Sequence, residues 1–238
     1  MKKLIFSVPY QRPKQLTDPY LDFIEDKNLL DAIIMTKDES LNFLHFSCLF
    51  QPILPAGTYE ETVYFLPWAL RFIIKKGDGA TDIMYNIIIW AEMNKKMLIK
   101  DSIYAKIINF IKFFFHTSFK SFNLIRNGVH CLYPENGAFI FSILNASLKN
   151  KTLHAFVSNW IKNSFYSFAR NYNFAAWQIW LINESYRYQD YPYKSMFQSC
   201  LYNQELKDNA YNIVIEEVMK TDNNILLDYW DKELHLVI

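Results

Sequence analysis

The residues best suited to acid–base chemistry are two pairs of adjacent glutamates, Glu60–Glu61 and Glu216–Glu217. Both pairs lie in segments with helical periodicity, and adjacent residues on a helix point about 100° apart. A general acid and a general base must face the same substrate, so this spacing favours a solvated helix face over a catalytic pair.

A nucleophile beside a base occurs once, at His130–Cys131, but neighbours in sequence cannot face each other on a helix or a strand. Cys48, Cys131 and Cys200 are too far apart for a metal-binding or disulfide pattern. The chain also lacks the sequence motifs of phosphate loops, zinc proteases and serine hydrolases. We therefore expect a protein without catalysis, without a cofactor and without a metal ion.

The elements that must position these residues are predicted to be helices. Only 5 of the 238 residues are glycine, and apolar residues recur at helical spacing along most of the chain. We expect more than about 60% helix and essentially no sheet beyond the first ten residues. The first fourteen residues should form an extended segment. The predicted helices span roughly 18–35, 39–50, 58–76, 80–98, 102–122, 136–148, 151–168, 173–187, 193–202, 205–220 and 223–234.

The helix predicted over 58–76 has the clearest end signals. Thr58 and Glu61 match a capping box, in which each side chain bonds the other residue's backbone N–H. Two lysines suit the last turn, and Gly77 suits the C-terminal stop. Pro67 lies inside the pattern and should kink or briefly interrupt the helix.

Short connectors between these helices predict antiparallel neighbours. The expected fold class is all-α, with about ten helices in stacked antiparallel pairs, either HEAT/armadillo-like or an irregular helical array. We expect a single domain over residues 1–238, with 123–135 as a possible hinge. Neither a secretion signal nor a membrane-spanning segment is apparent, which indicates a cytoplasmic protein without a membrane partner.

Charge is unevenly distributed, although the net charge is only +1. Residues 1–61 carry 6 basic and 9 acidic groups, residues 62–187 carry 15 and 6, and residues 188–238 carry 4 and 9. The basic middle, where lysines alternate with aromatic residues, leaves open a helical-repeat nucleic-acid-binding or scaffold protein. Its basic residues would then share one face: Lys106, Lys112, Lys120, Lys162 and Arg170.

A second alternative is a helical enzyme whose site is assembled from carboxylates far apart in sequence, such as Asp82, Glu92 and Glu184. Such a site would leave no sequence motif.

The segment Gly57-Thr-Tyr-Glu-Glu-Thr-Val-Tyr-Phe-Leu-Pro-Trp-Ala-Leu70, followed by Ile87-Ile-Ile-Trp90, resembles a pattern in small helical immunity proteins encoded beside bacterial polymorphic toxins. The resemblance covers about a sixth of the chain, on these two segments alone. It implies a cytoplasmic protein that binds and blocks one toxin without catalysis.

Acidic residues beside aromatic residues are the expected partner-binding surface, because acidic groups steer basic partners and aromatic anchors supply affinity. The alternative for the C-terminal residues is an end helix that packs its apolar side and exposes its acids to water. The candidate partner-binding residues are Glu60, Glu61, Asp228, Tyr229, Trp230, Asp231 and Glu233.

Overall fold

The computed structural model describes residues 6–17, 24–51, 56–127, 131–167, 171–187, 193–195 and 203–234. Of these residues, 75% are helical, which confirms the all-α class and the expected helix content. The chain divides into two compact units: 1–113 with 138–154, and 114–137 with 155–238. The segment 123–135, expected as a possible hinge, lies inside the second unit.

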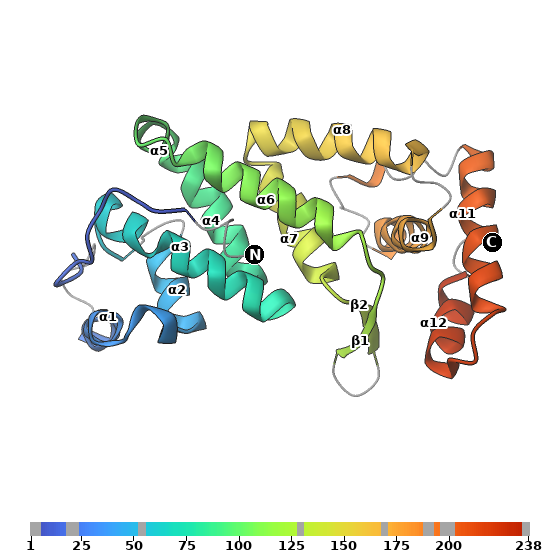
Figure 1. Ribbon diagram of the computed structural model, residues 1–238, viewed down its shortest axis with the longest axis horizontal. Helices are drawn as coiled ribbons and strands as arrows, with labels where there is room; N and C mark the ends of the chain where they lie inside the picture. Colours follow the sequence, from blue (N-terminus) through green and yellow to red (C-terminus); the bar gives the residue numbers. More distant parts are fainter. Residues whose placement is uncertain are drawn as a thin grey trace. The chain divides into compact units, whose positions relative to one another are not determined.

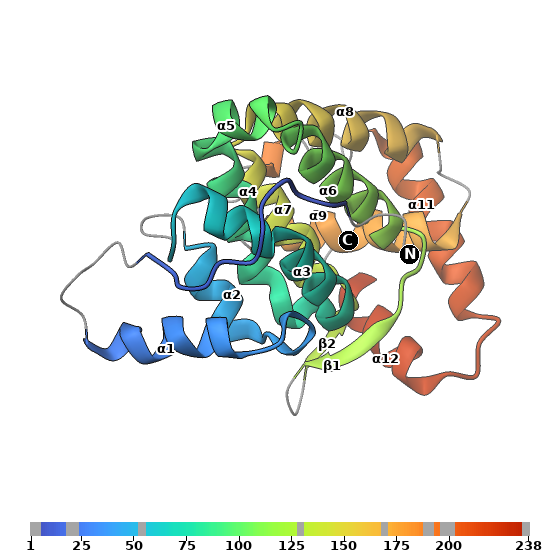
Figure 2. The same cartoon turned by 60° about the vertical axis from the view of Figure 1, so that its left-hand side comes forward.

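The first unit begins with an extended segment, residues 6–17, followed by helices that Figure 1 shows in blue and green. Figure 2 shows the same elements after a turn of the view. The elements are α1 (Ile24–Met35), η2 (Asp38–Ser40), α2 (Phe43–Leu49), α3 (Tyr59–Lys76), η3 (Gly77–Ala80), α4 (Thr81–Met93), α5 (Lys95–Lys100) and most of α7 (Gly137–Ser147). Two further helices, α6 (Tyr104–Ser118) and α8 (Lys151–Ser167), begin in this unit and end in the second.

The end signals of α3 are confirmed. Thr58 is its N-cap and forms both bonds of the capping box with Glu61. Gly77 follows the last turn with a φ of 55°, a left-handed conformation that glycine adopts without a steric penalty. The helix runs without interruption through Pro67, so the expected break is absent.

The core of the first unit lies between α2, α3 and α4, which pack against one another. Leu66 and Leu70 of α3 and Ile87 of α4 are fully buried. The ring of Trp90 lies edge-on to Phe50, with centroids 5.5 Å apart. A helix that is apolar on more than one side belongs in the interior of a fold, and α3 and α4 lie there.

The predicted helix 80–98 is divided at Asn94 into α4 and α5. The break is slight, because Asn94 N–H still bonds the Trp90 carbonyl and Leu98 N–H bonds the Asn94 carbonyl. Helix 193–202 falls largely outside the described residues.

The second unit contains the ends of α6 and α8, a β-hairpin, α9 (Tyr172–Arg187), α11 (Gln204–Val218) and α12 (Asn224–Leu234). Helices α9, α11 and α12 pack against one another. Trp160, Trp177 and Trp230 are buried in this unit with Phe119 and Phe122, and the Phe119 and Trp160 ring centroids are 4.2 Å apart.

The hairpin corrects the expectation that no sheet lies beyond the first ten residues. Strands β1 (Leu124–Asn127) and β2 (Cys131–Pro134) are antiparallel, with Leu124 opposite Pro134. The register pairs Asn127 with Cys131, so residues 128–130 connect the strands, and a connection of three to five residues that contains a glycine is a hairpin signal.

Candidate partner-binding site

A surface depression of about 500 Å³ lies where the extended segment 6–17 crosses the start of α3. This Tyr10 depression includes two of the predicted partner-binding residues, Glu60 and Glu61. Its lining residues are Tyr10, Gln11, Pro13, Lys14, Gln15, Thr58, Glu60 and Glu61.

One carboxylate fixes the aromatic wall of the depression. Oδ2 of Asp101 accepts hydrogen bonds from the hydroxyls of Tyr10, at 2.6 Å, and Tyr59, at 2.9 Å. The bond to Asp101, with burial and the negative charges of Asp101 and Glu60, raises the pKa of Tyr10 to about 12. Burial, followed by the bond to Asp101, raises the pKa of Tyr59 further. Both hydroxyls therefore stay protonated donors at neutral pH.

Glu61 is used within the fold. Its Oε2 accepts from the backbone N–H of Thr58, at 2.8 Å, and of Thr17, at 3.0 Å, and its Oε1 accepts from the Thr17 hydroxyl. Glu61 thus caps α3 and attaches the end of the N-terminal segment. Glu60 differs, because its side chain is exposed and forms no ion pair within the described residues.

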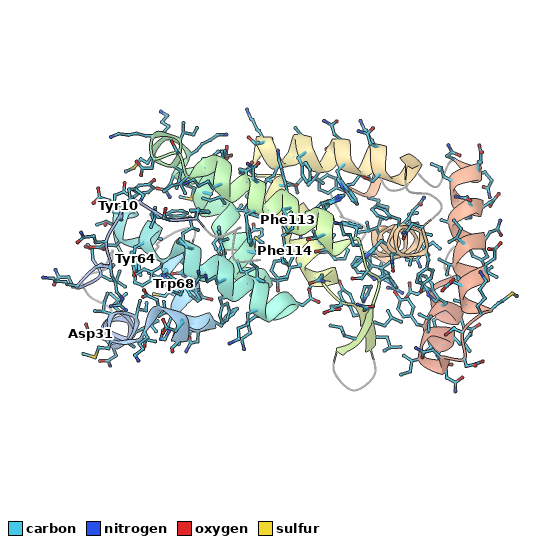
Figure 3. The ribbon with its side chains drawn as sticks, in the orientation of Figure 1. Tyr10, Asp31, Tyr64, Trp68, Phe113 and Phe114 are labelled. Carbon is cyan, nitrogen blue, oxygen red and sulfur yellow. The ribbon has the colours of Figure 1, made fainter. Side chains whose placement is uncertain are left out.

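Arg12 holds the middle of the same segment. Its guanidinium donates to the carbonyls of Ile34, at 2.8 Å, and Thr36, at 2.6 Å, and to Oδ1 of Asp38, at 2.9 Å. A cation at the C-terminal carbonyls of α1 is favoured by the helix dipole. Oδ2 of Asp38 accepts from the Tyr64 hydroxyl of α3, and Figure 3 shows Tyr10 and Tyr64 along this side of the unit. The segment is thus bound at Tyr10, Arg12 and Thr17.

Sequence reasoning missed Tyr10, Arg12 and Asp101 as parts of this site. They carry no local signal, because their partners lie 22 to 91 residues away. A single tyrosine or aspartate is unremarkable until the fold brings its partner to it.

The C-terminal candidates separate into buried and exposed residues. Tyr229, Trp230 and Glu233 are at most 5% exposed and lie in the core of the second unit. Trp230 stacks on Phe122, with centroids 5.4 Å apart, and its Nε1 donates to the Tyr172 hydroxyl. The expectation that these three residues contact a partner therefore finds no support in their placement.

Asp228 and Asp231 lie on the exposed side of α12. This placement agrees with the alternative for these residues, in which an end helix packs its apolar side and exposes its acidic residues to water. Their role at a partner surface stays a prediction. Glu60 and Glu61 belong to the first unit and α12 belongs to the second, so the two acidic groups are separate candidate surfaces.

Glu233 is held by an ionic cluster that joins α9 and α12. Arg187 donates from Nη1 to Glu184 and from Nη2 to Oε1 of Glu233, the latter at 2.6 Å. Nδ2 of Asn183 donates to Oε2 of Glu233 at 2.8 Å. Burial raises the pKa of Glu184, and Arg187 opposes that effect. The Tyr229 hydroxyl is buried and has no hydrogen-bond partner among the described residues.

Most aromatic residues that alternate with lysines in the basic middle are not presented for base stacking, although Phe113 is 48% exposed. Phe115, Phe119, Trp160 and Trp177 are at most 9% exposed, and their rings pack on one another within the second unit. These residues are core, which is the usual role of aromatics at helical spacing.

The basic residues of that region are partly accessible. Lys106, Lys120 and Lys162 are exposed, Lys112 is half-buried, and Arg170 lies outside the described residues. Lys106 belongs to the first unit, and Lys120 and Lys162 to the second. The nucleic-acid alternative stays a prediction that depends on these lysines and on the exposed ring of Phe113.

The three carboxylates of the enzyme alternative have separate surroundings. Asp82 is exposed in the first turn of α4, and Glu92 lies ten residues later on that helix, about 15 Å along its axis. Glu184 belongs to the second unit. Neither unit therefore brings two of these acids within the distance of a catalytic carboxylate pair, roughly 5–9.5 Å.

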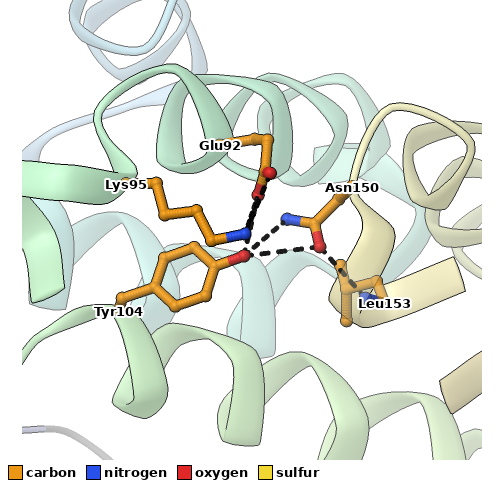
Figure 4. Close-up of polar contacts among 5 residues, drawn as sticks. All are labelled: Glu92, Lys95, Tyr104, Asn150 and Leu153. Carbon is orange, nitrogen blue, oxygen red and sulfur yellow. Dashed lines mark hydrogen bonds and ion pairs between the residues drawn. The ribbon is translucent and has the colours of Figure 1, made fainter. Parts of the chain in front are cut away.

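Glu92 instead belongs to a polar network inside the first unit, shown in Figure 4. It accepts from the Tyr104 hydroxyl at 2.8 Å and from Nζ of Lys95 at 3.0 Å. Asn150 donates to Tyr104 at 3.2 Å and accepts from the Leu153 N–H at 3.0 Å. The network joins α4, α5 and α6 to the start of α8.

Among the described residues, no group of three or more histidine, cysteine, aspartate or glutamate side chains could hold a metal ion. No helix in the described ranges is long and apolar enough to cross a bilayer. Compared with protein-family models, with curated proteins and with solved structures, the chain matches none of them.

Proposed function

We propose that this chain is a cytoplasmic immunity-type protein that neutralises a cognate bacterial toxin by direct, stoichiometric binding. The observation that supports this most is the state of Glu60 in the Tyr10 depression. Its carboxylate is exposed, while the neighbouring acids Glu61 and Asp101 are bound by groups of the chain itself. A partner cation would therefore meet one available carboxylate on a wall that is already ordered.

The chemistry of such a partner follows from the depression. Tyr10 supplies an aromatic ring, Gln11 and Gln15 supply amides, Glu60 supplies a negative charge and the exposed Lys14 a positive one. A basic side chain of a toxin would pair with Glu60 and lie against Tyr10, and a negative group speeds the encounter with a basic protein. Toxins that attack nucleic acids are commonly basic, which suits this surface. The resemblance of 57–70 to immunity proteins covers the same helix start.

A test uses the full chain and the toxin encoded beside its gene. Glu60→Lys should slow association and reduce protection of cells that express the toxin. Asp82→Lys is the matched control, since Asp82 is also an exposed carboxylate in the first turn of a helix. Both changes lose the same helix-dipole interaction, so they should affect folding alike.

The proposal requires a complex of defined stoichiometry between the chain and that toxin. If the toxin does not bind, the proposed function is wrong. If it binds and protection is equal for the two variants, the Tyr10 depression is not the binding surface.

A further inference from the structure

A second surface of the first unit combines exposed apolar side chains with lysines. It begins at the junction of α4 and α5, where Met93 is 65% exposed, Met97 46% and Ile99 57%. Lys96 and Lys100 of the same turn are exposed. Residues 95–100 form α5, so their side chains advance by about 100° each.

This geometry puts the four exposed side chains of α5 on one face. At 100° per residue, Lys96 and Lys100 fall between Ile99 on one side and Met97 on the other, and the exposed Met93 precedes them at the end of α4. Leu98 points the opposite way and is fully buried. On the exposed face of this turn, two lysines therefore lie between apolar side chains.

The turn between α7 and α8 also combines an exposed apolar side chain with exposed lysines. Leu148 is 46% exposed, and Lys149 and Lys151 are exposed beside it. Figures 1 and 2 both show α5 and the beginning of α8 on the same side of the first unit. The network of Glu92, Lys95, Tyr104 and Asn150 connects the two turns directly (Figure 4). We call these two turns the lysine–apolar edge.

The carboxylates near this edge form no salt bridges with its exposed lysines among the described residues. Glu92 is occupied by Lys95 and Tyr104, and Asp101 accepts from two tyrosine hydroxyls. Helices α6, α7 and α8 contain no aspartate or glutamate. Lys96 and Lys100 form no salt bridge within the described part of the chain.

We propose that the lysine–apolar edge binds an anionic lipid surface. Lysines contribute roughly 1 kcal/mol each beside anionic headgroups, and exposed apolar side chains enter the boundary between headgroups and acyl chains. The long aliphatic stems of the lysines let the ammonium groups reach the lipid phosphates while the neighbouring apolar side chains insert. Binding of this kind needs no membrane-spanning helix. It replaces the expectation of no membrane partner, which was based on the absence of a spanning segment.

Two other partners fit the edge less well. Protein interfaces are depleted in lysine and enriched in aromatic residues, arginine and methionine. The two turns, residues 93–100 and 148–151, contain four exposed lysines and no aromatic residue or arginine, and Met93 and Met97 are their only residues of the enriched kinds. Nucleic acid would satisfy the lysines but would leave four large apolar side chains in water. A lipid surface accommodates both kinds of group.

Vesicle sedimentation with the full chain tests this inference. The protein should bind vesicles of equal parts phosphatidylglycerol and phosphatidylcholine, and it should not bind pure phosphatidylcholine. Lys96→Gln with Lys100→Gln should lower the partition coefficient roughly 25-fold, from about 1 kcal/mol per lysine. Met97→Ser with Ile99→Ser should lower it while the salt dependence is retained.

Lys162→Gln with Lys220→Gln is the matched control, because it changes the net charge equally at exposed residues of the second unit. Absence of wild-type binding, or an equal loss in control and edge variants, overturns the inference. If the edge variants bind vesicles normally but lose a protein partner, the edge is a protein surface instead. Toxin binding by Lys96→Gln with Lys100→Gln should be unchanged, which separates this inference from the proposed function.

Discussion

The hydroxyl of Tyr10 donates a 2.6 Å hydrogen bond to Asp101, which lies 91 residues further along the chain. The same carboxylate oxygen accepts from Tyr59, in the first turn of α3. One acid therefore binds the N-terminal segment to the helix that carries Glu60. The shape of the Tyr10 depression depends on this long-range contact.

Asp101→Ala should lower the pKa of Tyr10 from about 12 towards its ordinary value of 10.0. The raised pKa means that the folded state binds the phenolic proton more tightly. Its contribution to stability is complete below pH 10.0 and is lost as the pH rises towards about 12. Spectrophotometric titration of tyrosine ionisation measures the change, with Asp82→Ala as the control. An unaltered titration in Asp101→Ala would contradict the assigned contact.

Glu61→Ala should destabilise the protein by about 1–2 kcal/mol, because it removes the helix cap and the contact with Thr17. Glu60→Ala removes a neighbouring carboxylate that is exposed, so its effect should stay within about 0.5 kcal/mol. Urea denaturation of both variants gives the comparison. Equal losses of stability would show that Glu61 does not have the structural role described.

Glu184 should make stability depend on pH in the acidic range. Burial raises its folded-state pKa above 4.5. The favourable contribution is therefore complete below that value and is lost as the pH rises through the folded-state pKa. Relative to Glu184→Gln, the wild type should lose stability as the pH rises from 4.5 through the folded-state pKa. Urea midpoints across this range test the prediction, with Glu216→Gln as an exposed control. A constant difference would contradict it.

Replacing Asp228 and Asp231 with lysine should slow association with the toxin more than it changes folding, since both side chains are exposed. Trp230→Ala should instead destabilise the second unit by about 3–5 kcal/mol, because the indole is fully buried. Association rates measured beside thermal unfolding separate the two effects. Unchanged association in the aspartate variant would remove α12 from the partner surface.

If the basic middle binds nucleic acid, affinity should fall by roughly one logarithmic unit per phosphate contact for each tenfold rise in salt. Lys120→Gln with Lys162→Gln should then reduce that slope by about two. Gel-shift titration at several salt concentrations measures both quantities. No shift at low ionic strength would eliminate this alternative.

Local sequence was sufficient to predict most helices of this protein. The ends of α3 could be placed within one residue, because Thr58, Glu61 and Gly77 act on neighbouring backbone groups. Helix α8 could be placed equally well, because one turn of helix repeats its apolar spacing regardless of distant residues. The hairpin did not follow from the scarcity of glycine in the chain, although the glycine in its three-residue connection is a local signal.

Tertiary structure decided which residues of those helices reach a partner. Sequence periodicity shows that α12 has an apolar side and an acidic side, but Trp230 could have been an anchor or a core residue. Its packing on Phe122, more than a hundred positions earlier, determines the answer. The same holds for Glu61 and Glu60, adjacent acids of which one is bound to Thr17 and the other is exposed. Burial and pairing depend on contacts between distant segments, which no local pattern encodes.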